Sequence, residues 1–158
     1  MIIIAKKINK EDLDNSVKLY GQYFSDIMQE YEDLYNKSKK YLETSEQNID
    51  TLSKLPIGTK GAQHYLNEHL TNASSLISQC QSLADSKYRV KKSIVDYALK
   101  DLSGDDDGNE QGLLEAMNTV IEEERKKQIA KDKAITKLLE DNEDIDAKID
   151  EILKSSNQ

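Results

Sequence analysis

The residue types that most often do chemistry are few in this chain and poorly spaced for it. His64 and His69 are the only histidines, and five residues on a helix separate two side chains by about 140°, so they cannot hold one metal ion together. Cys80 is the only cysteine and falls on an apolar stripe between Ile77 and Leu83. No base is in register with it, so we interpret it as a small buried hydrophobe and not as a nucleophile.

Two other segments have the letters of ligand-binding loops but the wrong spacing. In the acidic segment 103–112, placing Gly108 at the sixth position of a calcium loop puts Leu114 at the twelfth, where a bidentate glutamate is required. The segment Gly58-Thr59-Lys60-Gly61 lacks both the spacing of a phosphate loop and an apolar strand before it. We therefore expect a protein that is not an enzyme and uses no metal and no cofactor.

The composition favours long helices over a sheet. The 158 residues include six glycines and one proline, too few to punctuate a many-stranded sheet, and 33% of them are charged. Asn9 suits the N-cap of a first helix, which we expect over residues 10–54. Its apolar residues follow a strict four- and three-residue spacing. They are Leu13, Val17, Tyr20, Phe24, Ile27, Tyr31 and Leu34, and the frame continues through Ser38, Tyr41, Ser45, Asn48 and Leu52, where it becomes more polar.

Proline and glycine predict a turn after this helix. Leu55–Gly61 contains the only proline and two of the six glycines. A second helix is expected over residues 62–102, and the short connection favours antiparallel packing of the two. The fold class that follows is all-α, with a long coiled-coil-like helical hairpin over residues 10–102. Because its seam is apolar and exposed, the hairpin is expected to form a homo-oligomer.

The last third of the chain is expected to be a separate element. An acidic Gly/Asp linker occupies residues 103–112, and an acidic C-terminal helix follows over 113–158, while residues 1–9 form an N-terminal arm. The polar stretch Glu122–Lys127 interrupts the apolar positions of this helix. We therefore expect the helix to order only in an assembly.

The net charge of −8 comes from the last third of the chain. Residues 103–158 hold 16 acids and 8 bases, whereas the rest is near neutral, which favours a basic protein partner for the C-terminal helix. The hairpin has one basic cluster, formed by Lys87, Arg89, Lys91 and Lys92. These cations are candidates for contacts with double-stranded DNA, although solvated helix surface is the more common role of such a cluster.

The aromatic residues and the cysteine count bear on partners and location. Six of the nine aromatics lie within residues 20–41, and the acids among them favour packing over base stacking. A single cysteine excludes an intramolecular disulfide, which favours an intracellular protein. The apolar start, Met1–Ala5, is too short for a signal-peptide core or a membrane span, so no membrane association is expected.

The order of these segments resembles a known family. A helix containing Tyr41-Leu42-Glu43-Thr44, a Pro/Gly turn, a helix ending in Tyr88-Arg89-Val90-Lys91-Lys92 and a charged C-terminal segment are similar to the small terminase subunits of tailed phages, particularly the T4-like group. The similarity covers about residues 30–100. Many members of that family carry an N-terminal helix-turn-helix, and this chain has no recognition helix there.

The resemblance implies a role in viral DNA packaging. In that family the hairpin assembles into rings, and the protein helps to select DNA and stimulates the large terminase subunit without catalysis of its own. The acidic C-terminal helix would meet the large terminase or the portal, and the location would be the host cytoplasm. The implied oligomer contacts are Phe24, Ile27, Tyr31, Leu34, Leu76, Ile77, Cys80 and Leu83.

Two functions therefore remain open from the sequence. The first is a non-enzymatic, oligomeric DNA-packaging factor of the small-terminase type. The alternative is a coiled-coil scaffold, adaptor or virion assembly protein without DNA binding, which the acidity and the missing recognition helix favour.

Overall fold

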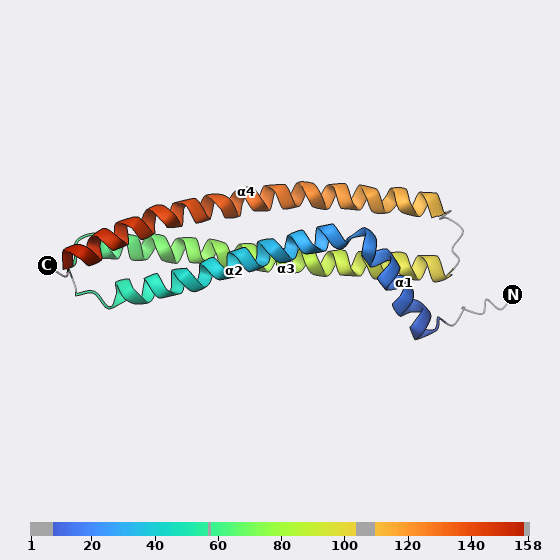
Figure 1. Ribbon diagram of the computed structural model, residues 1–158, viewed down its shortest axis with the longest axis horizontal. Coiled ribbons are helices and arrows are strands. Elements are labelled where there is room, and N and C mark those ends of the chain that lie inside the picture. The colour runs from blue at the N-terminus through green and yellow to red at the C-terminus, as the bar shows by residue number, and fades with distance from the viewer. Residues whose placement is uncertain (1–7, 57, 104–109, 157–158) are drawn as a thin grey trace. The chain divides into compact units, whose positions relative to one another are not determined.

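The structure is a computed structural model that describes residues 8–56, 58–103 and 110–156, and 93% of these residues are helical. Four helices follow one another along this part of the chain: α1 (Lys10–Tyr23), α2 (Ser25–Ser53), α3 (Ala62–Ser103) and α4 (Glu110–Ser156) (Figure 1). None of the described residues forms a strand, so the predicted all-α class is confirmed. None of the helices in the described part has an apolar stretch long enough to cross a membrane.

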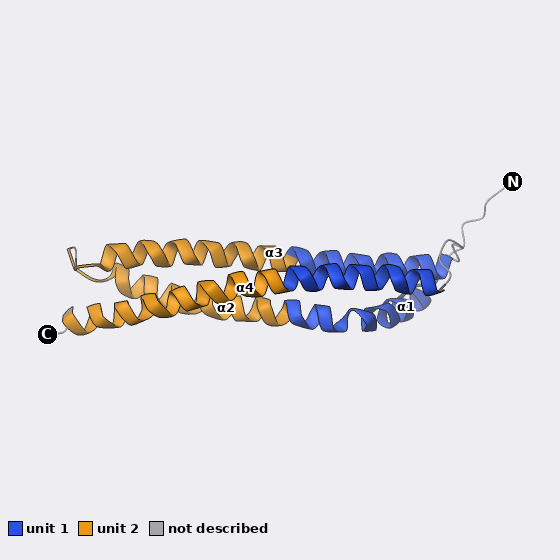
Figure 2. Cartoon of the chain, turned by 90° about the horizontal axis from the view of Figure 1, so that it is seen from above, with its two compact units in different colours: residues 1–31, 85–128 blue, residues 32–84, 129–158 orange. Residues whose placement is uncertain are grey.

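Contacts within the chain define two compact units. Unit 1 comprises residues 1–31 and 85–128, and unit 2 comprises residues 32–84 and 129–158 (Figure 2). Helices α2, α3 and α4 each contribute residues to both units. The predicted hairpin with a separate C-terminal helix is therefore incomplete, because α4 supplies part of the core of each unit.

The core of unit 1 is rich in aromatic side chains. Phe24 is fully buried, and its ring stacks on that of Tyr97 with 6.2 Å between centroids. Offset ring stacking of this kind adds to the free energy gained from burial alone. The other buried hydrophobic residues of this unit come from all four helices: Tyr20, Ile27, Tyr31, Val90, Ile94, Ala98, Met117 and Ile121.

The helix predicted over residues 10–54 is broken at Phe24. Phe24 has φ −103° and ψ 5°, and its N–H donates to the carbonyl of Gly21 at 3.1 Å, which tightens the last turn of α1. The hydroxyl of Ser25 donates to the carbonyl of Gln22 at 3.0 Å and so satisfies a group left free by the break. The sequence gives no sign of this break, because no proline lies near Phe24 and the apolar spacing continues through it. The predicted cap at the start of α1 is correct, since the side chain of Asn9 accepts from the N–H of Glu11 at 2.9 Å.

In unit 2, α2 buries several residues from the second half of the predicted four- and three-residue spacing. Leu34, Ser38, Ser45 and Leu52 are all buried there, as the four- and three-residue spacing requires. The serines are small enough to let neighbouring helices approach closely, and the hydroxyl of Ser38 donates to the carbonyl of Leu34 at 2.9 Å. The buried residues that α3 and α4 contribute to this unit are His69, Leu76, Leu83, Ile135, Leu139, Asn142, Ile145 and Ile149.

The predicted turn between α2 and α3 depends on two glycines. Gly58 and Gly61 have φ angles of +91° and +82°, in the left-handed region that side chains with a Cβ rarely adopt. A Cβ on Gly61 would also lie 3.4 Å from Cδ1 of Ile152, so this position is tight. The N–H of Thr59 donates to the carbonyl of Pro56 at 3.1 Å and closes the turn.

The linker between α3 and α4 is shorter at both ends than the predicted segment 103–112. Ser103 belongs to α3, and α4 begins at Glu110, before the predicted start at residue 113. The rest of the linker, residues 104–109, lies outside the described residues, as do the same six positions of the calcium loop considered above and most of the predicted N-terminal arm.

The oligomer contacts implied by the resemblance are mostly core residues of this chain. Six of the eight are buried inside their own unit, with exposed fractions of 3% or less: Phe24, Ile27, Tyr31, Leu34, Leu76 and Leu83. They are not available to a second copy in this fold, because α4 supplies the missing side of the seam. Ile77 is 47% exposed and Cys80 is half-buried, so only these two lie toward the surface.

Leu76 and Ile77 provide a matched test of this assignment. Leu76→Ala should lower the free energy of unfolding by about 2–5 kcal/mol, because it leaves a cavity at a fully buried site. Ile77→Ala, one residue away and half exposed, should cost well below that, within roughly 1 kcal/mol. Urea unfolding followed by circular dichroism measures both, and equal losses would contradict the assignment of Leu76 to the core and Ile77 to the surface.

Candidate functional site

The predicted basic cluster lies on α3 within unit 1, but two of its four cations make contacts within the chain. The guanidinium of Arg89 donates to both carboxylate oxygens of Glu124, at 2.9 Å from Nη2 and 3.1 Å from Nε. Lys87 is half-buried and makes a contact of its own. Lys91 and Lys92 are exposed and pair with no acid in the described part of the chain. The four-cation cluster is thus reduced to two unpaired lysines.

Glu124 is the centre of a buried polar network in unit 1. Its side chain is only 4% exposed, and besides Arg89 it accepts a hydrogen bond from the hydroxyl of Tyr31. The ammonium of Lys127 lies 3.6 Å from the same carboxylate. Burial and the bond to Glu124 raise the pKa of Tyr31 well above its ordinary value, which keeps the phenol protonated as a donor. One turn along α4, Gln128 donates to the carbonyl of Ile27 at 2.8 Å.

This network is not predicted when the polar stretch Glu122–Lys127 is taken as a gap in the apolar seam of the helix. The spacing contained the signal: Met117, Ile121, Glu124 and Gln128 are separated by four, three and four residues and are all buried. Glu124 and Gln128 therefore continue the seam with polar side chains. A polar residue at a seam position predicts a buried partner, because an unpaired buried charge is costly.

An apolar stripe remains exposed on α3 in unit 1. Tyr88 is 71% exposed, and Val95 and Leu99 are each 36% exposed. Spacings of seven and four residues place these side chains within about 40° of one another around the helix. Lys91 and Lys92 lie on either side of this line, offset by roughly 60° and 40° from Tyr88. We call these five residues the α3 stripe.

A second polar layer lies in unit 2. His69 is fully buried, and its Nε2 lies 3.5 Å from Oδ1 of Asp146 on α4. The same Asp146 oxygen accepts from Nδ2 of Asn48 on α2 at 2.5 Å. One turn away, Asn72 donates to Asn142 at 2.7 Å. Asn48 was recognised as a polar member of the seam, but its partners were not, because they lie on other helices.

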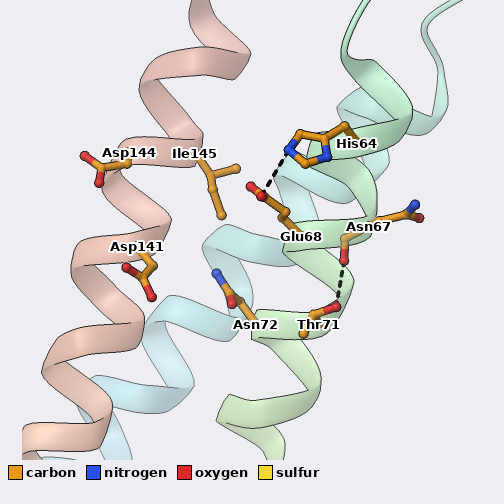
Figure 3. Close-up of a pocket in the computed structure, with 8 residues that line it drawn as sticks. All are labelled: His64, Asn67, Glu68, Thr71, Asn72, Asp141, Asp144 and Ile145. Atoms are coloured by element: carbon orange, nitrogen blue, oxygen red, sulfur yellow. Dashed lines mark hydrogen bonds and ion pairs between the residues drawn. The ribbon is translucent and has the colours of Figure 1, made fainter.

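The open pocket between α3 and α4 in unit 2 is polar. Figure 3 shows His64 and Glu68 on one wall, and Asp141 and Asp144 on the facing helix. Nε2 of His64 lies 3.1 Å from Oε1 of Glu68. No group of three or more histidine, cysteine or acidic side chains in the described chain is arranged to hold a metal ion. The two histidines also differ in setting, since the side chain of His64 is 67% exposed.

Ile77 and Cys80 line a shallow groove between α2 and α3 in unit 2. The groove holds about 440 Å³, and Leu42 and Tyr35 also line it. Burial raises the pKa of the Cys80 thiol, so the reactive thiolate is disfavoured. Its lining residues include no histidine that could act as a base toward Cys80.

The Glu124 network predicts an asymmetric response to mutation. Arg89→Met leaves the buried carboxylate of Glu124 with only Tyr31 and the more distant Lys127, and should cost about 3 kcal/mol of unfolding free energy, the lower end of the range for breaking a buried ion pair. Glu124→Gln should cost less, about 1–3 kcal/mol, because the Arg89 side chain is 46% exposed and can turn to water. The double variant should recover part of the loss of Arg89→Met. Denaturant unfolding of the three variants measures this order, and a reversed order would mean that Glu124 is not the more buried partner.

These contacts and exposed surfaces are the basis for assigning a function. Among them, the α3 stripe combines exposed apolar area with unpaired charge, whereas the two polar layers are buried. No family model, curated protein or solved structure matches this chain.

Proposed function

We propose that the protein is a non-enzymatic helical adaptor that binds an acidic amphipathic helix of a partner protein along the α3 stripe. The observation that carries the proposal is the exposure of Tyr88, Val95 and Leu99 on one face of α3 between two unpaired lysines. Single exposed apolar residues are normal on a protein surface. A row of them at helical spacing is the pattern that a docking helix requires.

Charge selects the partner. Lys91 and Lys92 flank the apolar line in the way that charged residues flank the seam of a coiled coil, where they choose partners of opposite sign. A partner helix with leucines at heptad spacing and glutamates beside them would bury the apolar side chains and pair both lysines. Tyr88 suits the centre of such an interface, because tyrosine supplies a large apolar ring with a polar end.

A second candidate is a DNA-packaging factor of the small-terminase type, which would assemble with its own copies and with a large terminase or portal. The exposure of Lys91 and Lys92 beside Tyr88 favours it. Fewer observations support it, because Arg89 is occupied by Glu124 and only two unpaired lysines of the cluster remain for phosphate contacts. Two phosphate contacts would give a salt dependence with a slope of only about −1.8.

Binding to defined probes tests the two candidates. The probes are a synthetic helical peptide with a leucine seam and glutamate flanks, the same peptide with lysine flanks, and a short DNA duplex. We expect the acidic peptide to bind at low salt and the basic peptide to bind much more weakly. Reversing both charges in Lys91→Glu/Lys92→Glu should lower the affinity for the acidic peptide by about tenfold or more. Val95→Ser/Leu99→Ser should lower the same affinity to a similar extent, because it removes apolar contact area.

The matched control reverses two other exposed lysines, Lys126→Glu/Lys133→Glu on α4, and should leave the affinity nearly unchanged. Fluorescence anisotropy measures the affinities, and circular dichroism checks that each variant is folded. Absence of acidic-peptide binding by the unaltered protein would reject the adaptor proposal. Duplex binding that is lost in the Lys91/Lys92 variant but kept in the Val95/Leu99 variant would favour the DNA-packaging candidate instead.

A further inference from the structure

The second polar layer contains the one buried histidine of the chain, and it has no role in the α3 stripe. We propose that this layer is an acid-sensitive latch, in which protonation of His69 loosens the packing of α4 against α2 and α3 within unit 2. The latch is independent of the proposed adaptor function. It rests on where His69 lies, on what contacts it and on the charges that face it.

The geometry leaves the imidazole of His69 poorly satisfied. Its exposed fraction is 0%, and neither ring nitrogen has a hydrogen-bond partner among the described residues. The distance of 3.5 Å from Nε2 to Oδ1 of Asp146 is longer than a normal N–H···O bond. That oxygen already accepts the amide of Asn48 at 2.5 Å. A neutral ring can be buried here at moderate cost, whereas a charged ring would need stronger partners than it has.

The charges around His69 come from two helices. Asp146 faces it from α4 and Glu68 flanks it on α3, and both carboxylates favour the protonated ring. From α2 the facing side chain is Asn48, which carries no charge. Burial opposes protonation and outweighs both acids, so the pKa of His69 lies below its ordinary value of 6.5.

The sign of the pH effect follows from this difference. In the unfolded chain His69 takes up a proton near pH 6.5, but in the folded chain it does so only at lower pH. Between these two values the unfolded state binds more protons, so stability falls as the pH falls through that window. Asp146 acts in the opposite direction, because burial raises its pKa and outweighs the lowering by His69, while the nearby acids Asp150 and Glu143 raise it further. The contribution of His69 must therefore be isolated by comparing variants.

A pair of histidine variants provides that comparison. In His69→Gln the acid-induced loss assigned to this residue should vanish, whereas His64→Gln should behave like the unaltered protein, because the side chain of His64 is 67% exposed. Urea unfolding is measured at about pH 7.5 and about pH 5.5. Over that range the folded-to-unfolded ratio of the unaltered protein should fall, relative to His69→Gln, by up to about tenfold. An equal pH dependence in both proteins would overturn the latch.

Two measurements on the unaltered protein do not depend on whether His69→Gln folds. Titration of the imidazole signals by NMR should give a pKa below 6.5 for His69, and a value at or above 6.5 would reject the proposal. Hydrogen exchange should show amides of unit 2 near Asn48, His69 and Asp146 losing protection on mild acidification, while those of unit 1 change less. Loss of protection confined to unit 1 would equally reject it.

Discussion

The rest of this structure depends on one constraint, that the apolar face of α4 is buried within each unit. Helices α2 and α3 each present a line of apolar side chains that water would otherwise reach, and α4 covers that line within each unit. In unit 1 the covering residues include Met117 and Ile121, and in unit 2 they include Ile135 and Ile149. A single chain thereby closes a seam that two helices alone would leave open, which removes the physical reason to expect self-association through it.

Two buried polar layers interrupt this seam, one in each unit. An apolar heptad seam tolerates shifts by one repeat, because each leucine or isoleucine meets an equivalent environment after the shift. A shifted register would leave the buried carboxylate of Glu124 without Arg89 and Tyr31, and would separate the half-buried Asp146 from Asn48. We interpret the layers as devices that select one register, at some expense in stability.

The same layers decide what is left on the surface for function. Arg89 and Tyr31 have residue types that recognise nucleic acids and proteins, but both are occupied by Glu124 inside unit 1. The exposed surface on that part of α3 includes the apolar side chains of the α3 stripe and two unpaired lysines. This arrangement favours recognition of a complementary helix over recognition of a phosphate backbone, which would gain from several cations.

The sequence by itself determined the helical class, the turn at Leu55–Gly61 and most of the buried positions of α1 and α2 between Tyr20 and Leu52, because glycine content, proline position and heptad spacing act locally along one chain. The break at Phe24, the partners of Glu124 and the burial of His69 were decided by tertiary structure. Each depends on residues far apart in sequence, such as Tyr97 for Phe24 and Asp146 for His69. Periodicity shows which face of a helix is buried, but it carries no information on which other helix covers that face.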